Sequence, residues 1–424
     1  MTNSAGGNTG TTAGIGLTIA LMSLWMNPAA QATTAPGYSE SVVYAFTNTN
    51  GDGFQPAATL TPGSRGVYFG ATDGGASCGG NIFELKPDRT GGFTETPIFA
   101  FDCFGKGGAP SGPPILDARG HLYGAAGIGG SSNNGIVYEL KRTRTGGYKE
   151  VILYTFTGGS DGSFPGPVIA DAAGNLYGTT GFGGGSCGCG TVYKLTPGNS
   201  GYTLSVLYTF QGGSDGSSPS FPLLLGSNGN LYGTTDFGGP SNTGTVFQLI
   251  PNGNAYTETV LYGFQGGTDG ERVESGLIAD SSGALYGTTG FGGKDGQGVV
   301  YKIVPSGQNS TETVLYNFQG GGDGIEPSYT PIMDGNGNLY GVTAQGGISN
   351  CGGVDGCGTV YELKLQSSGS YRKHTLYSFA TAPDGNTPNG LLFGRGHTLL
   401  GTTIYGGSQN CDDGGCGTIV QLAR

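Results

Sequence analysis

Six aspartates, each followed by glycine, recur at similar positions along this 424-residue chain. They are Asp52, Asp161, Asp215, Asp269, Asp323 and Asp384, whereas the second repeat carries Lys106 at this place. A ring of carboxylates on one face can hold calcium or a polyol, because hard cations prefer oxygen ligands. Alternatively, each aspartate accepts bonds from nearby backbone N–H groups and fixes a turn. Because the residue recurs in nearly every repeat, the pattern favours the turn-fixing role.

Aromatic side chains occupy one equivalent position in four of the repeats, two residues after a Leu-Tyr-Gly-Thr-Thr segment or its variant. These residues are Phe182, Phe237, Phe291 and Tyr405. On an open surface they can stack on a sugar ring or a peptide partner. Between neighbouring repeats they would instead be part of the core, and the sequence favours this packing role.

One segment departs from the repeat. Glu271-Arg272-Val273-Glu274 replaces the Ser/Pro-rich sequence found elsewhere after the aspartate. Arg272, between two glutamates, is a candidate for binding an anionic group. The alternative interpretation is a solvated run of charges.

Material for catalysis is scarce. Of the three histidines, His121 and His397 fall in turns and His374 at the start of a fourth strand, which suggests neither a Ser-His-Asp triad nor a metal cluster. Two carboxylates on neighbouring repeats could still perform acid–base chemistry on a glycoside. An enzyme is therefore kept as the alternative to a binding module.

The eight cysteines are mostly paired over short loops. The most economical set of disulfides is Cys351–Cys357, Cys411–Cys416, Cys187–Cys189 and Cys78–Cys103. Zinc is the alternative, but these spacings do not match those of zinc fingers. Disulfides are typical of exported proteins.

These residues are positioned by a repeat of about 54 residues. Its marker is the glycine of Leu-Tyr-Gly, found at Gly70, Gly124, Gly178, Gly233, Gly287, Gly341 and Gly401. In the third copy, we expect strands at residues 167–170, 176–180, 191–195 and 205–210, separated by glycine-rich turns. Each repeat therefore predicts a four-stranded antiparallel unit.

Seven four-stranded repeats predict an all-β fold, a seven-bladed β-propeller. Residues 42–46 match the fourth strand of a repeat but precede the first complete repeat. The last repeat, in contrast, ends with its third strand, at residues 418–422. We therefore expect the N-terminal strand to complete the last blade and close the ring. Because strands alternate in direction, the aspartate loops and the long glycine-rich loops should share one face. The tight Asp-x-x-Gly turns should lie on the other.

Three motifs carry a resemblance to the GloVer tandem-repeat family. They are Leu-Tyr-Gly-Thr-Thr, Cys-Gly-Thr-Val-Tyr-Lys/Glu-Leu (residues 189–195 and 357–363) and Thr-Val-Leu-Tyr-x-Phe (residues 259–264 and 313–318). The sequence resembles this family over residues 42–424. The resemblance implies an exported bacterial repeat array, with no established catalytic residue. The layout is also similar to that of kelch propellers, as an analogy only.

The net charge and the N-terminal sequence indicate which partners and which location are expected. The net charge of −11 argues against binding to nucleic acid or anionic membranes. An apolar run at residues 13–26, followed by Ala30 and Ala32, predicts a signal peptide over residues 1–32. No Lys or Arg precedes the run, which leaves a wrongly assigned start codon or a short membrane anchor as the alternatives. We expect a linker at residues 33–41, the propeller at residues 42–424, and no membrane span in the mature chain.

The sequence thus predicts a secreted or cell-surface monomer that binds carbohydrate or a surface protein. We expect no cofactor other than calcium. The alternatives are a glycoside hydrolase or lyase using carboxylates, and a purely structural surface repeat.

Overall fold

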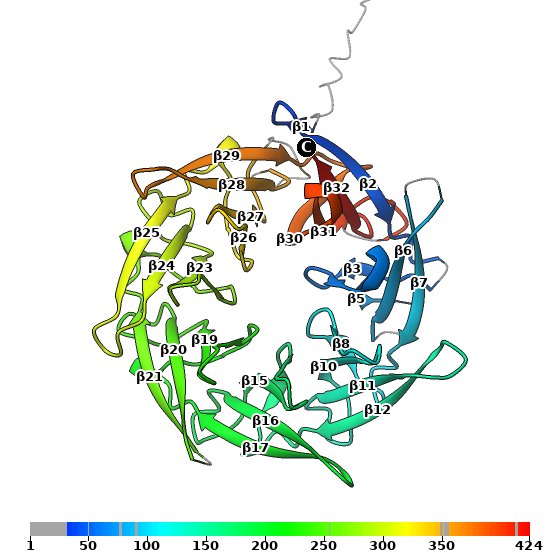
Figure 1. Cartoon of the computed structure of the whole chain (residues 1–424), viewed down its shortest axis with the longest axis vertical. Coiled ribbons are helices and arrows are strands. Elements are labelled where there is room, and N and C mark those ends of the chain that lie inside the picture. Colours follow the sequence, from blue (N-terminus) through cyan, green and yellow to red (C-terminus); the bar gives the residue numbers. More distant parts are fainter. Residues whose placement is uncertain are drawn as a thin grey trace, which may run out of the picture.

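The chain forms seven antiparallel sheets arranged around a central axis, as the computed structural model shows (Figure 1). The structure describes residues 32–49, 51–75, 79–89, 92–253, 255–347, 351, 356–411 and 414–424. The predicted seven-bladed β-propeller is confirmed.

Each blade has its innermost strand near the axis and its fourth strand on the outer wall. The first blade contains β3 (Phe54–Pro56), β4 (Thr61–Pro62), β5 (Tyr68–Gly74), β6 (Asn81–Pro87) and β7 (Phe93–Ala100). The second contains β8 (Gly108–Pro110), β9 (Ile115–Leu116), β10 (Leu122–Ile128), β11 (Ile136–Arg142) and β12 (Tyr148–Thr155). The third contains β13 (Ser163–Pro165), β14 (Ile169–Ala170), β15 (Leu176–Phe182), β16 (Thr191–Gly198) and β17 (Gly201–Thr209).

The remaining blades follow the same order. The fourth contains β18 (Leu224–Leu225), β19 (Leu231–Thr235), β20 (Thr245–Asn252) and β21 (Ala255–Gly263). The fifth contains β22 (Ile278–Ala279), β23 (Leu285–Thr289), β24 (Val299–Val304) and β25 (Thr311–Asn317). The sixth contains β26 (Ile332–Met333), β27 (Leu339–Thr343), β28 (Thr359–Leu365) and β29 (Tyr371–Ser378). The seventh contains β30 (Gly385–Phe393), β31 (Leu399–Gly406), β32 (Thr418–Ala423) and β2 (Ser39–Ala45).

Short 3₁₀ helices occupy some of the connections. They are η1 (Ser64–Gly66), η2 (Gly213–Asp215), η3 (Gly267–Asp269), η4 (Gly321–Asp323) and η5 (Arg395–His397). In the part of the chain that the structure describes, none of the helices is long and apolar enough to cross a membrane.

The ring closes through its two ends. β2 pairs antiparallel with β32, from Ser39 opposite Ala423 to Ala45 opposite Thr418. The N-terminal strand is therefore the outer strand of the last blade, as the sequence predicts, and Figure 1 shows both strands in one sheet. Residues 33–41, expected as a linker, instead carry β1 (Thr33–Thr34), which pairs with β29, and the start of β2.

The marker glycine is explained by its cross-strand partner. Gly178 lies opposite Tyr193 in the β15–β16 pair, and a side chain at Gly178 would collide with the Tyr193 ring. Six blades place an aromatic ring opposite this glycine, whereas the seventh has Val420. The ring thus covers the backbone of the neighbouring strand and fills the blade interior.

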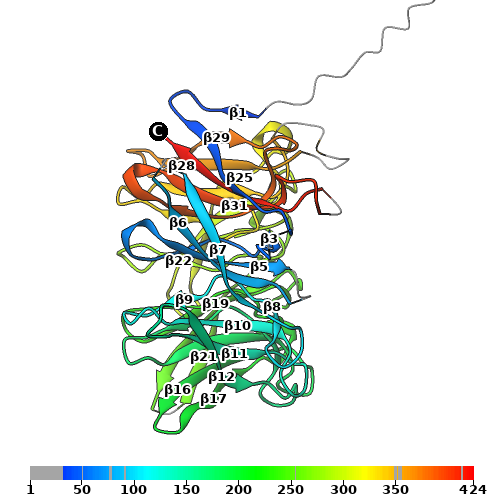
Figure 2. The same ribbon diagram turned by 90° about the vertical axis from the view of Figure 1, so that its right-hand side faces the viewer.

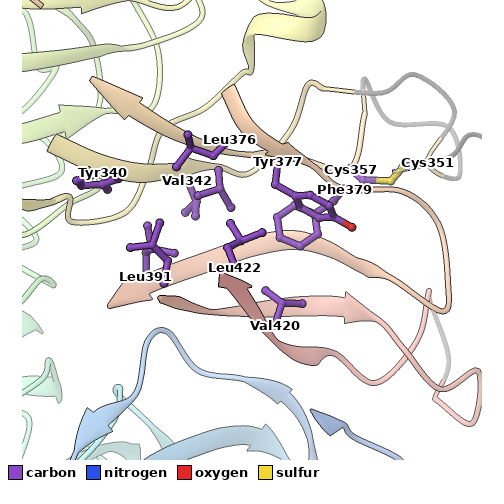
Figure 3. Close-up of a cluster of buried hydrophobic side chains, with 12 residues drawn as sticks. Tyr340, Val342, Cys351, Cys357, Leu376, Tyr377, Phe379, Leu391, Val420 and Leu422 are labelled. Carbon is purple, nitrogen blue, oxygen red and sulfur yellow. A yellow bond between two sulfur atoms is a disulfide. The ribbon is translucent and has the colours of Figure 1, made fainter. Parts of the chain in front are cut away.

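The core lies between blades. A fully buried phenylalanine follows each outer strand and meets the next blade. Phe210 packs edge-to-face on Phe247 with ring centroids 5.1 Å apart, and Phe264 packs on Tyr301 in the same way. Such pairs contribute roughly 0.5–1.5 kcal/mol beyond area burial. Figure 3 shows the last junction, where Phe379 and Leu376 of the sixth blade meet Val420 and Leu422 of the seventh.

The two faces of the disc differ, and Figure 2 views the disc from its edge. On one face, here called the loop face, the loops after the second strands bond to the crossing loops that join successive blades. For example, the Gly239 amide donates to the Gly213 carbonyl at 2.8 Å. The opposite face, here called the turn face, carries the Asp-x-x-Gly turns and the outer hairpins.

Candidate functional site

The crossing aspartates are engaged within their own loops. Asp269 accepts hydrogen bonds from the Tyr262 hydroxyl and the Gln265 amide, both at 2.8 Å. The same two kinds of bond form at Asp52, Asp161, Asp215, Asp323 and Asp384. These contacts are those of a turn-fixing side chain. Within the described residues, no group of three or more His, Cys, Asp or Glu side chains is placed to hold a metal ion.

A cavity of about 360 Å³ lies on the axis of the propeller. All seven blades contribute to its walls, which are largely apolar, with Val168, Phe221 and Leu391 among the lining residues. Glu274 is the carboxylate among the described residues that line it. Enclosed cavities of this size with few polar groups are typical ligand sites.

A strained backbone position recurs in every blade, close in sequence to the residues that line this axial cavity, here also called the channel. The residue three after the crossing aspartate, or after Lys106 in the second blade, has a φ between 51° and 62°. These residues are Gln55, Ala109, Phe164, Ser218, Arg272, Glu326 and Thr387. Non-glycine residues rarely adopt this conformation, which costs on the order of 1–3 kcal/mol each.

The neighbouring blade holds each of these residues in place. The Arg272 amide donates to the Thr243 carbonyl at 3.0 Å, and the Phe164 amide donates to the Asn134 carbonyl at 3.0 Å. The other five make the equivalent bond to the preceding blade. A uniform backbone thus presents seven side chains of different chemistry in one ring, here called the channel mouth.

The charges of the channel mouth gather on blades four to six. An Arg272 guanidinium nitrogen lies 2.6 Å from Glu274 Oε1, and the guanidinium lies over the Phe291 ring at 5.5 Å. The Ser328 hydroxyl donates to Glu274 Oε2 at 2.9 Å. Gln345 donates to Glu326 at 2.9 Å. The segment 271–274, singled out from the sequence, is therefore part of a polar network and not a simple solvated run.

Asp236 joins this network from the fourth blade. Burial, and after it the charge of Glu274, raise its pKa to about 7 against the opposing effect of Arg272. Its Oδ1 atom is buried and has no hydrogen-bond partner among the described residues. Burial and the Glu274 charge also raise the pKa of Glu326. The site thus contains three carboxyl groups and one guanidinium.

The sequence analysis missed Asp236 and Glu326. A signal existed for Asp236, because most blades have Gly or Ala at its place after the second strand, and only the first blade has another acid, Asp73. For Glu326 the signal was weaker, since the left-handed position accepts almost any residue.

Aromatic side chains flank the charges. Phe182 is 55% exposed and Phe237 is 39% exposed, so neither is the core plug that the sequence favours. Phe182 meets Phe164, itself 48% exposed, with ring centroids 5.7 Å apart. Phe291 and Tyr405 are half-buried. Exposed rings grouped on the loop face are typical of a contact surface.

Three of the expected disulfides are confirmed: Cys187–Cys189, Cys351–Cys357 and Cys411–Cys416. Cys103 is also disulfide-bonded, but its expected partner Cys78 lies outside the described residues. Disulfides indicate an oxidising, extracellular environment. The expected signal peptide, apart from Ala32, also lies outside the described residues.

The fold is similar to that of several solved structures. One is PorZ, a surface component of the type-IX secretion system of Porphyromonas gingivalis, at 13% identity and a TM-score of 0.51, covering 89% of this chain and 47% of PorZ. Another is a Dyadobacter fermentans protein of unknown function, at 12% identity and a TM-score of 0.45, covering 92% and 99% of the two chains. A third is the Trypanosoma rangeli sialidase, at 11% identity and a TM-score of 0.41, covering 92% and 59%. Such identities bear on the fold alone.

No curated protein matches the sequence. The model of the Gloeobacter/Verrucomicrobia repeat matches residues 164–420, which is more than half of the chain and agrees with the resemblance drawn from its motifs. The chain is therefore a member of the Gloeobacter/Verrucomicrobia repeat family.

Proposed function

We propose that this propeller is an exported binding module that takes a carbohydrate at the channel mouth. The observation that carries the proposal is the pairing of exposed aromatic rings on blades three and four with the polar network on blades four to six. Sugar rings stack their C–H faces on aromatic rings, and their hydroxyls donate to carboxylates. Phe164 and Phe182 would supply the stacking surface, and Asp236 and Glu274 would accept the hydroxyls.

The uniform backbone of the channel mouth also supports recognition. Seven left-handed residues are held alike, yet their side chains range from Ala109 to Arg272. Strain of this kind concentrates at functional positions. Because the backbone is fixed while the side chain can vary, the ring of side chains can be adapted to a ligand.

The proposal includes export of the protein from the cell. The disulfides are typical of an oxidising compartment, and the apolar run at residues 13–26 is that of a signal peptide. A secreted or cell-surface binding module would meet polysaccharides there. A surface protein is the alternative ligand, because exposed aromatic rings also anchor protein partners.

A glycan array, followed by titration calorimetry on the best oligosaccharide, tests the proposal. We expect Phe182→Ala and Asp236→Asn to weaken binding by about tenfold or more, which corresponds to about 1.4 kcal/mol. Phe104→Ala is the matched control, since Phe104 is 75% exposed but lies on the second blade. Absence of any glycan ligand, or equal loss in all three variants, would refute the proposal.

Hydrolysis is the second candidate function. It is favoured by one observation: Asp236, with a pKa raised to about 7, faces the charge of Glu274. Carboxyl pairs with separated pKa values are the usual acid–base apparatus of glycosidases. Mass spectrometry of the bound oligosaccharide after incubation would detect cleavage. Products that persist in Asp236→Asn would assign the reaction to a contaminant.

A further inference from the structure

Positive charge is concentrated on the first two blades, although the chain as a whole is acidic. Residues 54–155 contain nine of the 18 Lys and Arg residues but eight of the 29 Asp and Glu residues. Nine basic minus eight acidic residues leaves these blades with a net charge of +1, against −12 for the rest of the chain. The net charges therefore favour the approach of an acidic ligand to these two blades over the rest of the chain.

A cleft of about 420 Å³ lies on the turn face between these two blades. We call it the basic cleft, and it is lined by Glu84, Lys86, Asp117, Arg119, Arg142 and Tyr148, among others. Its two acids are already neutralised. Lys86 Nζ lies 2.6 Å from Glu84, and an Arg119 guanidinium nitrogen lies 2.9 Å from Asp117.

Arg142 is the surplus cation of the basic cleft. It makes no ion pair with any residue that the structure describes. Four other blades have proline at the equivalent position, namely Pro87, Pro197, Pro251 and Pro305. The fold itself therefore requires no charge at this position, which is arginine in the second blade and again in the seventh, at Arg424.

The hairpin that carries Arg142 bears two further cations outside the basic cleft. Lys141 of β11 lies directly opposite Lys149 of β12, and both side chains are exposed. Because neighbouring residues of a strand alternate in direction, this pair projects from the blade surface opposite to that of Arg142 and Tyr148. Arg144, in the turn of the same hairpin, is also exposed.

A second cleft on the turn face is similar in size to the basic cleft, so size alone does not distinguish the two. It has a volume of about 450 Å³, lies between the second and third blades, and also contains Arg119. Its charged residues are Arg119, Asp117 and Asp171, so acids outnumber cations there. The positive surplus belongs to the basic cleft.

We propose that the basic cleft binds an acidic polysaccharide through a uronate residue. Arg142 would pair with the uronate carboxylate, because a guanidinium fork matches a carboxylate in two parallel bonds. The half-buried ring of Tyr148, which lines the same cleft, would contact the sugar ring. The volume suits one sugar ring.

The concave shape favours a saccharide over an anionic membrane, since a flat bilayer cannot enter a cleft between blades. The acidic remainder of the chain would also repel such a membrane. The basic cleft lies on the face opposite the channel mouth, so this proposal does not depend on the one made above.

Calorimetry with trigalacturonate on the full chain tests this inference, with a neutral trisaccharide and phosphatidylglycerol vesicles as further probes. We expect binding of trigalacturonate that weakens with added salt, an approximately tenfold or greater loss in Arg142→Ala, and partial recovery in Arg142→Lys. Lys364→Ala is the matched control, because it removes one exposed cation from the equivalent hairpin of the sixth blade and should leave binding unchanged.

Three results would overturn the proposal: no binding of trigalacturonate, equal weakening by Arg142→Ala and Lys364→Ala, or binding to the vesicles alone. Equal binding of the neutral trisaccharide would also overturn it, because the carboxylate would then play no part.

Discussion

Lys373 places its ammonium nitrogen 2.9 Å from the Asp323 carboxylate, at the junction of the fifth and sixth blades. The same ammonium donates to the Thr375 hydroxyl at 2.9 Å and lies over the Phe318 ring. Five other blades carry glutamate at the position of Lys373, six residues before the buried phenylalanine. They are Glu40, Glu95, Glu150, Glu258 and Glu312.

At four of those junctions the carboxyl group faces the aspartate of the crossing loop, whereas Glu150 faces Lys106. Burial, and after it the Asp52 charge, raise the pKa of Glu95 to about 8. Burial, followed by the charge of the crossing acid, raises the pKa of Glu40, Glu258 and Glu312 to about 7. Burial raises that of Glu150 to about 7, with Lys106 opposing.

These shifts predict that the propeller is more stable in mild acid than in mild base. Below the unfolded-state pKa of about 4.3 both states hold the proton. As the pH rises through about 7 to 8, the folded state must ionise buried carboxyl groups and loses stability. Urea midpoints at about pH 5.5 and about pH 8.5 should show the lower value at the higher pH. A higher midpoint at the basic pH would contradict the assignment.

Glu312→Gln tests one junction directly. The Glu312 Oε1 atom is buried without a partner, so removing its charge should leave stability at mildly basic pH unchanged or increased and reduce its dependence on pH. Glu312→Leu reproduces the third blade, which has Leu204 at this position. Urea unfolding at the two pH values measures both variants. A loss of stability in Glu312→Gln at basic pH would show that the carboxylate is paired.

Lys373→Met removes a buried cation, whereas Glu312→Gln removes a buried carboxylate. The first change leaves the Asp323 carboxylate without its cation in a largely buried setting, because the Lys373 side chain is only 4% exposed. We expect the free energy of unfolding to fall by about 3 kcal/mol or more, as when one partner of a buried ion pair is removed. A loss no larger than that of an exposed pair, under about 1 kcal/mol, would contradict this interpretation.

Gly178→Ala and Tyr193→Phe separate packing from hydrogen bonding inside a blade. The alanine methyl would collide with the Tyr193 ring, and we expect a loss of about 1–3 kcal/mol. Tyr193→Phe should be neutral or stabilising, because the buried hydroxyl has no partner among the described residues and the fourth blade carries Phe247 there. Urea titration distinguishes the two. A large loss in Tyr193→Phe would reveal a bond to that hydroxyl.

Much of the fold can be predicted from local features of the sequence. The marker glycines fix the period, and the offset of one strand between the two ends predicts the β2–β32 pairing. The bonds of the crossing aspartates are also local, since Asp269 accepts from Tyr262 and Gln265, a few residues earlier in the chain.

The candidate site could not be predicted from local sequence patterns. Asp236, Glu274 and Glu326 come from three different blades and meet only because the ring brings their loops together. The left-handed conformation of Phe164 and Glu326, each followed by proline, runs against local preference and is imposed by the neighbouring blade. Exposure of Phe182 likewise depends on what the next blade leaves uncovered.

A crystal structure with the bound oligosaccharide would show whether a carbohydrate binds at the channel mouth. We expect a sugar ring stacked on Phe182 or Phe164, with its hydroxyls within hydrogen-bonding distance of Asp236 or Glu274. A sugar seated on the outer wall, or on the turn face alone, would contradict it.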